Sequence, residues 1–530
     1  MKKIIITLSL SIFAIGLNNI LYGQADPKIL NWYNGGGTGM QTEKAYKILK
    51  DKKSSTVIVA VIDSGVDIEH EDLKGKIWVN SKEIAGNGID DDKNGYIDDI
   101  NGWNFLGNSK GENVNQANLE KTRLLRELST KFEGIDPATI STKDRSDYDL
   151  YLKVKTDVEE ERANMSQYLP QMEMLPKIIQ QVPITVAKKL NKENYTLSDL
   201  KKWKVTSDED KQLKNLAFAI LSGELSLEMI KEQSDHINGT LDYSLNVKFN
   251  ERTIIGDNPN DFSDKSYGNN NVEGPDALHG THVSGIIGAI RGNNLGGDGV
   301  ANDIKIMALR AVPNGDENDK DIALAIRYAV DNGAKVINMS FGKAYSPHQV
   351  EVYEAFKYAD SKGVLLIHAA GNDNANVDVS PNFPTSSYSF QKEKLDLFLT
   401  IGASTRSSKK DLAANFSNYG QTKVDIFAPG FEIYNTIPQS SYKLLQGTSM
   451  AAPMVAGVGA LLASYFPTLS MHEIKDIMLK SATLYKGKKI LLPGSEEIVD
   501  FATLSVTGGV INVKSAVKMC LELEKSKMTK

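Results

Sequence analysis

Three residues of the kinds needed for acyl transfer, Asp63, His279 and Ser449, each border an apolar stretch of the sequence. Serine becomes a strong nucleophile only when a histidine removes its proton, and a buried carboxylate then holds the histidine in the required tautomer. Asn372, which also follows an apolar run, offers a side-chain amide that could stabilise a developing oxyanion. These residue types predict nucleophilic acyl transfer.

The segment from Gly447 to Pro453 indicates how Ser449 is positioned. It leads into a run of Ala, Gly and Val without a charged face, which is typical of a buried helix. Pro453 belongs near a helix start, because only the first-turn amides lack partners within the helix. We therefore expect Ser449 at the start of a core helix. The alternative is a serine that only caps this helix, and the other three residues disfavour it.

The elements that position these residues follow an alternating pattern of strands and helices. Continuous apolar, β-branched runs are typical of strands buried on both faces of a parallel sheet. Helical patterns between several runs end at glycine, the usual helix stop. The pattern predicts an α/β fold of three layers with a mostly parallel central sheet, whose ligand site lies at the carboxyl ends of the strands. The apolar runs span residues 57–62, 304–312, 336–339, 364–370, 397–403 and 424–428.

Four segments around the candidate residues resemble the signatures of the subtilisin-like serine proteases. Their order along the chain, Asp then His then Ser, also matches that family. The resemblance covers about residues 41–104 and 258–516 and implies a subtilisin-like fold with serine endopeptidase activity on proteins or peptides. The four segments are Asp63–Asp67, His279–Gly285, Ala369–Asn372 and Gly447–Pro453.

Carried over position by position, the resemblance assigns a role to each residue. Asp63 would orient His279, His279 would be the general base, and Ser449 would be the nucleophile. Asn372 would hold the oxyanion. A further segment resembles the one whose backbone pairs with the substrate as an added strand, a mode that reads mainly the main chain. This segment consists of Ser340, Phe341 and Gly342.

Two structural calcium sites are expected. The first is a loop with oxygen-bearing residues at alternating positions around Gly95, the pattern of an EF-hand-type loop. Its twelfth position is Asn101 rather than Glu, which favours a loop attached to the subtilisin-like core over a true EF-hand; the alternative is a solvated acidic turn. The second site, implied by the resemblance, involves Asp72 and Asn293. The candidate ligands of the first are Asp90, Asp92, Asn94, Tyr96 and Asp98.

Composition and the first residues bear on compartment and partners. The chain has 530 residues, 41% hydrophobic and 24% charged, with a net charge of −6, so nothing points to nucleic acid or an anionic membrane as partner. Two lysines followed by an apolar run predict a signal peptide over residues 1–24. We therefore expect a secreted or periplasmic protein without stable membrane insertion. The single cysteine, Cys520, excludes an intramolecular disulfide. No organic cofactor is indicated, and the oligomeric state stays open.

The middle of the chain departs from the family. Residues 25–106 and 254–523 are predicted to form the subtilisin-like domain, with a charged tail over 524–530. Residues 107–253 read as a helical insertion, with candidate helices at 119–132, 148–168 and 208–232. The insertion either gates the cleft or takes over the chaperone and inhibitor roles of a prodomain; the alternative is a peripheral docking or stabilising module.

Two other functions fit parts of the sequence. An esterase of the α/β-hydrolase type requires Gly-x-Ser-x-Gly and the order Ser, Asp, His. Here Ala451 stands two positions after Ser449 and the order differs. The third hypothesis is a non-catalytic binding protein on a protease fold, which a permanently blocking insertion would produce.

Overall fold

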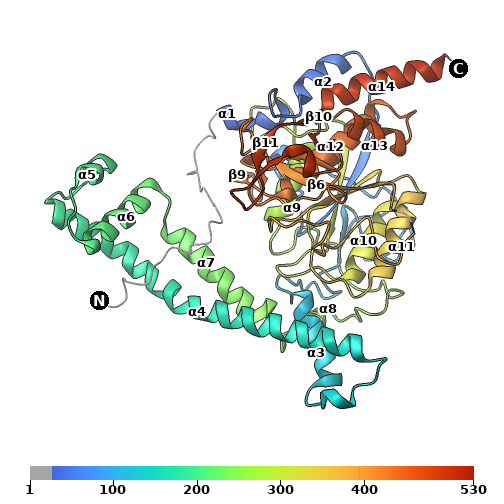
Figure 1. Cartoon of the computed structure of the whole chain (residues 1–530). Helices are drawn as coiled ribbons and strands as arrows, with labels where there is room; N and C mark the ends of the chain where they lie inside the picture. The colour runs from blue at the N-terminus through green and yellow to red at the C-terminus, as the bar shows by residue number, and fades with distance from the viewer. Residues whose placement is uncertain (1–26, 393, 530) are drawn as a thin grey trace. The chain divides into compact units, whose positions relative to one another are not determined.

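The chain divides into two compact units. The computed structural model describes residues 27–392 and 394–529, so the predicted signal peptide lies outside the described residues. The inserted unit spans residues 121–249, and the larger unit comprises the chain on either side of it (Figure 1). Residues 107–120 and 250–253, which the sequence pattern assigned to the insertion, lie in the larger unit.

The larger unit is built around a nine-stranded sheet in the order β10-β13-β7-β6-β5-β4-β1-β3-β2. All neighbouring strands pair in parallel except β10 and β13. In the register, Val59 of β1 lies opposite Ile306 on one side and Val336 on the other. The strands are β1 Val57–Asp63, β2 Gly102–Asn104, β3 Ile304–Arg310, β4 Val336–Met339, β5 Leu365–Ala369, β6 Phe398–Ser404, β7 Ile426–Pro429, β10 Thr483–Leu484 and β13 Gly509–Val510. Two hairpins stand apart, β8 Ile433–Ile437 with β9 Ser441–Leu445, and β11 Lys489–Leu491 with β12 Ile498–Asp500.

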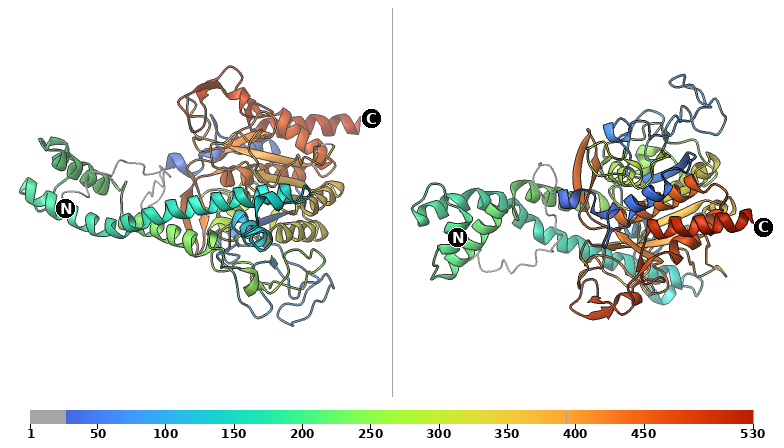
Figure 2. Two further views of the ribbon diagram at one scale, coloured as in Figure 1. Left: turned by 60° about the horizontal axis from the view of Figure 1, so that its bottom comes forward. Right: turned by 90° about the horizontal axis from the view of Figure 1, so that it is seen from above.

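Helices cover both faces of this sheet. Val59 and Val61 of β1 point into a core shared with α9, α12, α13 and α14, whereas Ala60 and Ile62 point into a second core shared with α10 and α11. Figure 2 shows α10 and α11 in yellow and α14 in red on opposite sides of the strands. The predicted three-layer α/β fold is confirmed. The helices are α1 Pro27–Leu30, α2 Thr42–Leu49, α8 Arg252–Ile255, α9 Leu278–Gly288, α10 Asp319–Asp331, α11 Gln349–Ser361, α12 Thr448–Tyr465, α13 Met471–Lys480 and α14 Val513–Met528.

Helix α12 is the core helix that the sequence predicts after Gly447. It is the one helix among the described residues that is long and apolar enough to cross a membrane, with a mean hydropathy of 1.3. However, 83% of its residues are buried within the protein. Its apolar composition is therefore explained by its place between the sheet and the helices α9 and α13, with which it packs.

The inserted unit is helical. The expected helix over 119–132 is α3 Glu120–Phe132, whereas the other two expected helices differ from their predicted ranges. The expected helix over 148–168 continues through three prolines, although each proline removes one hydrogen bond of the helix. The expected helix over 208–232 is two helices, because Gly223, at φ +78°, ends the first and Ser226 caps the second. The helices are α3 Glu120–Phe132, α4 Arg145–Leu190, α5 Leu197–Lys202, α6 Asp208–Ser222 and α7 Leu227–Gly239.

The C-terminal segment also differs from the prediction of a charged tail over 524–530. Helix α14 continues to Met528. Leu521 and Leu523 pack against the core, and Glu524 forms an ion pair with Lys52 at 2.7 Å. These contacts explain why charged residues after position 523 remain helical.

Candidate active site

Asp63 and His279 meet at the carboxyl end of β1. Nδ1 of His279 lies 2.7 Å from Oδ1 of Asp63, and the amide of Ser64 donates to the same oxygen at 2.7 Å. The carboxyl group is buried, while the imidazole side chain is 36% exposed. The carboxylate thus holds the ring by Nδ1 and leaves the exposed side of the ring for a reacting group.

Two glycines allow this approach. His279 is the second residue of α9, and a Cβ on the next residue, Gly280, would lie 2.1 Å from the carbonyl oxygen of Gly65. Gly65 has φ +132°, and its own Cβ would lie 2.0 Å from the Glu273 carbonyl oxygen. Only glycine fits either position, since a Cβ would overlap the facing backbone. The start of α9 can therefore lie directly against the end of β1.

The pKa of His279 reflects two opposing causes. Desolvation lowers the pKa of the imidazole, but the charge of Asp63 and its hydrogen bond raise it, and the net pKa is higher than the usual 6.5. A raised pKa makes the neutral imidazole a better proton acceptor. The pair therefore has the electrostatics required of a general base.

Ser449 is the second residue of α12, as the sequence predicts for a helix start. Pro453 has no N–H to donate to the carbonyl four residues earlier, which is that of Ser449. The hydroxyl of Ser340 donates to this oxygen instead, at 2.9 Å. The Ser449 hydroxyl donates to the Ser340 carbonyl at 3.3 Å. Ser449 is thus held against the loop that follows β4, with its hydroxyl in a long, weak bond.

Asn372 lies after β5 and contacts the same helix start. Its Oδ1 accepts hydrogen bonds from the amide of Thr448 at 2.8 Å and from the Thr448 hydroxyl at 3.0 Å. The residue is exposed. With Oδ1 occupied in this way, Nδ2 remains as a donor. Nδ2 and the Ser449 amide nitrogen border the same space, since a Cβ on Gly447 would lie 3.5 Å from each.

Ser340, Phe341 and Gly342 form an irregular segment after β4. The Phe341 carbonyl accepts a hydrogen bond from His368 Nε2 at 2.9 Å, and burial lowers the pKa of His368 to about 4, so the ring is neutral. Phe341 is buried rather than open to solvent. No partner within the described parts of the chain accepts from the Gly342 amide. The segment can therefore offer main-chain groups to another extended strand.

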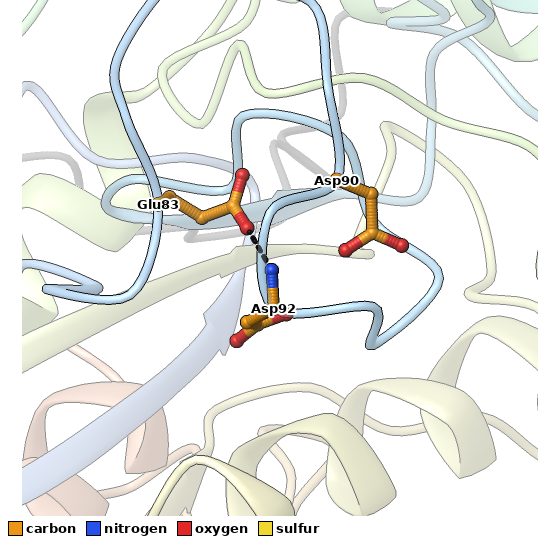
Figure 3. Close-up of side chains that lie close together, drawn as sticks. All are labelled: Glu83, Asp90 and Asp92. Carbon is orange, nitrogen blue, oxygen red and sulfur yellow. Dashed lines mark hydrogen bonds between the residues drawn. The ribbon is translucent and has the colours of Figure 1, made fainter.

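The acidic loop before β2 brings together part of the predicted metal set. Carboxylate oxygens of Asp90, Asp92 and Glu83 lie within 4.8 Å of one another (Figure 3). The Glu83 carboxylate accepts from the Asp92 amide at 3.0 Å, and the Asp90 carboxylate accepts from the amide of Gly95 at 2.8 Å. Three carboxylates this close repel one another unless a cation or protons offset their charge. The donor set fits a hard cation such as calcium, which prefers oxygen ligands.

The other three predicted ligands make contacts within the loop and with its neighbours. The Asp98 carboxylate accepts hydrogen bonds from the amides of residues 86, 87 and 88. The Asn94 side-chain amide donates to Asp99, and the ring of Tyr96 packs against Trp103. Glu83 was not predicted, because only the folding of the loop brings it beside Asp90 and Asp92.

Asp72 and Asn293 lie together, as expected for the second calcium site. Nδ2 of Asn293 donates to Asp72 Oδ1 at 2.6 Å, while Asp72 Oδ2 is buried without a hydrogen-bond partner among the described residues. Burial raises the pKa of Asp72 to about 6. A buried carboxylate oxygen without a hydrogen-bond partner is a group that fits a cation. Asn293 would first have to turn its amide, so that its oxygen rather than its nitrogen faces the ion.

The sequence of the chain is similar to those of known proteins. The sequence model of the subtilase family matches residues 54–502. The chain is 42% identical over 187 residues to the thermophilic serine proteinase of Bacillus sp. (strain AK1), covering 35% of this chain and 42% of that protein. It is 33% identical over 219 residues to subtilisin DY of Bacillus licheniformis, covering 40% of this chain and 75% of that protein.

A solved structure described as that of the prenylagaramide maturation protease PagA is also similar. It shares 28% identity and a TM-score of 0.37, covering 46% of this chain and 82% of that one. The chain spans less than half the length of the first of these relatives. The family match, in contrast, extends over most of the chain and includes all four candidate residues. The chain belongs to the subtilase family.

Proposed function

We propose that this protein is an exported serine endopeptidase that cleaves peptide bonds through an acyl-enzyme intermediate. The observation that carries the proposal is the 2.7 Å bond between His279 Nδ1 and Asp63 Oδ1, at a sheet edge that also holds a helix-start serine. In this arrangement the free Nε2 of His279 can accept a proton from Ser449. Activity on proteins or peptides is supported by membership of the subtilase family.

In the acylation step, the Ser449 hydroxyl leaves the Ser340 carbonyl and attacks the scissile carbonyl carbon. Its proton passes to Nε2 of His279, and the Asp63 carboxylate stabilises the imidazolium. The tetrahedral oxyanion accepts hydrogen bonds from Asn372 Nδ2 and from the Ser449 amide. The imidazolium then protonates the leaving amine, and the C–N bond breaks.

In the deacylation step the roles repeat with water. His279 takes a proton from the water, whose oxygen attacks the ester carbon of the acyl-enzyme, and the proton returns to Ser449 Oγ as the ester bond breaks. The acyl part of the substrate pairs as an extended strand with Ser340, Phe341 and Gly342. Support for this pairing comes from the open Gly342 amide.

Calcium is proposed as a structural ion at two places. Glu83, Asp90 and Asp92 would hold one ion, and Asp72 with Asn293 would help to hold another. Bound calcium would neutralise these carboxylates and rigidify their loops. Calcium takes no part in the chemical steps proposed for Asp63, His279 and Ser449.

The role of the inserted unit and the export of the protein also remain proposals. We propose that the inserted unit gates access to the cleft or replaces a prodomain; a peripheral stabilising role is the alternative. Export rests on the charged and apolar N-terminal sequence alone.

Active-site labelling tests the proposed function. A fluorophosphonate should modify Ser449 in the folded wild-type protein but not in Ser449→Ala, and only the wild type should cleave a peptide library. Because the serine is the attacking group, Ser449→Ala should lower kcat by roughly 10⁴–10⁶-fold. Folded wild-type protein that neither reacts nor cleaves would instead indicate a binding protein on a protease fold.

A further inference from the structure

The lysine that follows the proposed substrate segment, Lys343, is buried in an ionic cluster. Its Nζ lies 2.7 Å from Glu120 Oε2 and 2.8 Å from Asp319 Oδ1, and it donates to the Glu317 carbonyl at 2.9 Å. All three charged side chains are at most 5% exposed. Charged groups are costly to bury, so such a cluster is maintained only where its geometry is closely satisfied.

The backbone of Lys343 is fixed as firmly as its side chain. Its amide donates to the Phe383 carbonyl at 2.9 Å, and its carbonyl accepts from the Phe383 amide at 2.9 Å. The rings of Phe341 and Phe383 border a cavity of about 10 Å³ that Lys343 also lines. This space is no larger than a water molecule. The end of the segment therefore has little room to shift while the cluster is intact.

One partner in the cluster belongs to the stem through which the chain enters the inserted unit. Glu120 is the first residue of α3, the helix that continues into that unit. Its amide donates to Asp316 Oδ2 at 2.7 Å. The stem that leads into the inserted unit also contacts the stem by which the chain returns from it, since the Asn118 amide lies 3.4 Å from Glu251 Oε2. The position of Glu120 thus depends on both stems.

We infer that Lys343 is a positioning residue, which through Glu120 and Asp319 sets the place of the substrate-pairing segment relative to the insertion stem. The inference rests on the proposed function, in which residues 340–342 pair with the acyl part of a peptide. Through this contact the stem would affect the binding of extended substrates without touching them. Short substrates that do not pair with residues 340–342 would be unaffected.

The test compares Glu120→Gln with Asp257→Asn. Both changes replace a buried carboxylate that contacts a lysine, since Asp257 Oδ2 lies 2.8 Å from Lys320 Nζ. Asp257 also pairs with Arg252 of the returning stem, but Arg252 has two further hydrogen bonds, both to Asp321, that hold it in place. In both variants the ammonium keeps another acceptor, the Glu317 carbonyl for Lys343 and the Asn258 carbonyl for Lys320. Only Glu120 is joined to the substrate-pairing segment. Asp257→Asn is therefore a control for the loss of a buried charge.

The substrates are a p-nitroanilide with four residues on its acyl side and p-nitrophenyl acetate. Glu120→Gln should raise KM for the long substrate about tenfold and leave kcat/KM for the acetate and the rate of fluorophosphonate labelling within about twofold. Asp257→Asn should change none of these. Glu120→Asp keeps the charge but shortens the side chain, so it should raise KM less, and it serves if Glu120→Gln does not fold.

Several results would overturn the inference. These are equal losses on both substrates, no change on either, or the same rise in KM with Asp257→Asn. A wild-type protein that hydrolyses neither substrate and resists labelling would instead refute the proposed function, so the two failures are distinguishable.

Discussion

In the proposed mechanism, protonation of His279 sets the pH range in which Ser449 can be activated. The base must be neutral, and its pKa lies above 6.5 because the Asp63 charge outweighs desolvation. We therefore expect kcat/KM to rise with pH through a midpoint above 6.5. Asp63→Asn removes the negative charge that raises the pKa of His279. The midpoint should therefore move to lower pH, while kcat falls by roughly 10⁴-fold. The measurement is kcat/KM against pH for a small ester and a peptide.

A distant carboxylate serves as the control for this pH profile. Asp303 lies near the start of β1 and accepts from Ser54 and Thr56. Asp303→Asn should leave the midpoint unchanged. A wild-type midpoint below 6.5, or one that Asp63→Asn does not move, would contradict the assignment of Asp63 and His279.

Asn372 is expected to act on the transition state rather than on substrate binding. In a subtilisin, a related enzyme, losing the corresponding amide lowers kcat by about 10²–10³-fold, and we expect a similar loss with Asn372→Ala. Asn372→Asp keeps an oxygen for the Thr448 amide but loses the donor, so it should lose kcat without a fall in Tm. Unchanged kcat in both variants would remove Asn372 from the oxyanion hole.

The candidate catalytic residues could be predicted from the sequence because each lies in a short motif that borders an apolar run. The acidic loop was harder to predict. Alternating oxygens mark Asp90 and Asp92, but Asp98 has φ +54° and its carboxylate turns to the amides of residues 86–88. Glu83 joins the cluster through a loop closure that no local spacing encodes. The cluster around Lys343 likewise combines segments far apart in the chain.

The contact between α9 and the end of β1 makes a prediction about Gly280. Its added Cβ would lie 2.1 Å from the Gly65 carbonyl, so Gly280→Ala must displace α9 and with it His279. We expect a destabilisation of about 2–4 kcal/mol and a loss of most activity. Gly36→Ala is the control, since its Cβ meets only the flexible Lys44 ammonium, at 3.8 Å. Thermal unfolding and ester hydrolysis measure both effects; full activity in Gly280→Ala would contradict the argument.

Helices and strands of the larger unit follow closely from sequence pattern, whereas those of the inserted unit do not. Buried β-branched runs mark β1, β3, β4, β5, β6 and β7, and glycine stops mark the ends of α10 and α11, whereas the short strands β2, β10 and β13 were not predicted. Helix α4 instead contains Pro170, Pro176 and Pro183, which local rules treat as helix ends. Its continuation depends on tertiary packing, for example of Val182 and Val186 against Leu200 and Ala217.

Calcium should stabilise the protein in a pH-dependent way. Burial raises the pKa of Asp72 from 3.8 to about 6, so its ionisation costs stability as the pH rises through this window, because the unfolded chain ionises first. Calcium bound at this proposed site would hold Asp72 in its ionised form and should therefore reverse this cost. We expect the gain in Tm from calcium over EGTA to be larger at pH 7.5 than at pH 5, worth about 2.7 kcal/mol at 100 times Kd. Asp72→Asn should reduce the gain, whereas an equal gain at both pH values would speak against this site.

The two units predict where the insertion can be removed. Lys121 to Phe249 can be replaced by a short Gly/Ser linker, because Glu120 and Arg252 then remain with their partners Lys343 and Asp321. This shortened protein should fold with a Tm close to that of the wild type. Removal of residues 107–253 instead leaves Lys343 and Asp321 each without one buried charged partner, at a cost of about 3–5 kcal/mol per broken pair, and should abolish folding.

The activity of the protein that lacks residues 121–249, measured on a folded protein substrate, then decides the role of the insertion. If the shortened protein cleaves faster than wild type, the insertion acts as a gate. If the shortened chain does not reach the folded, active state, the insertion acts in place of a prodomain. An unchanged rate leaves only the peripheral role.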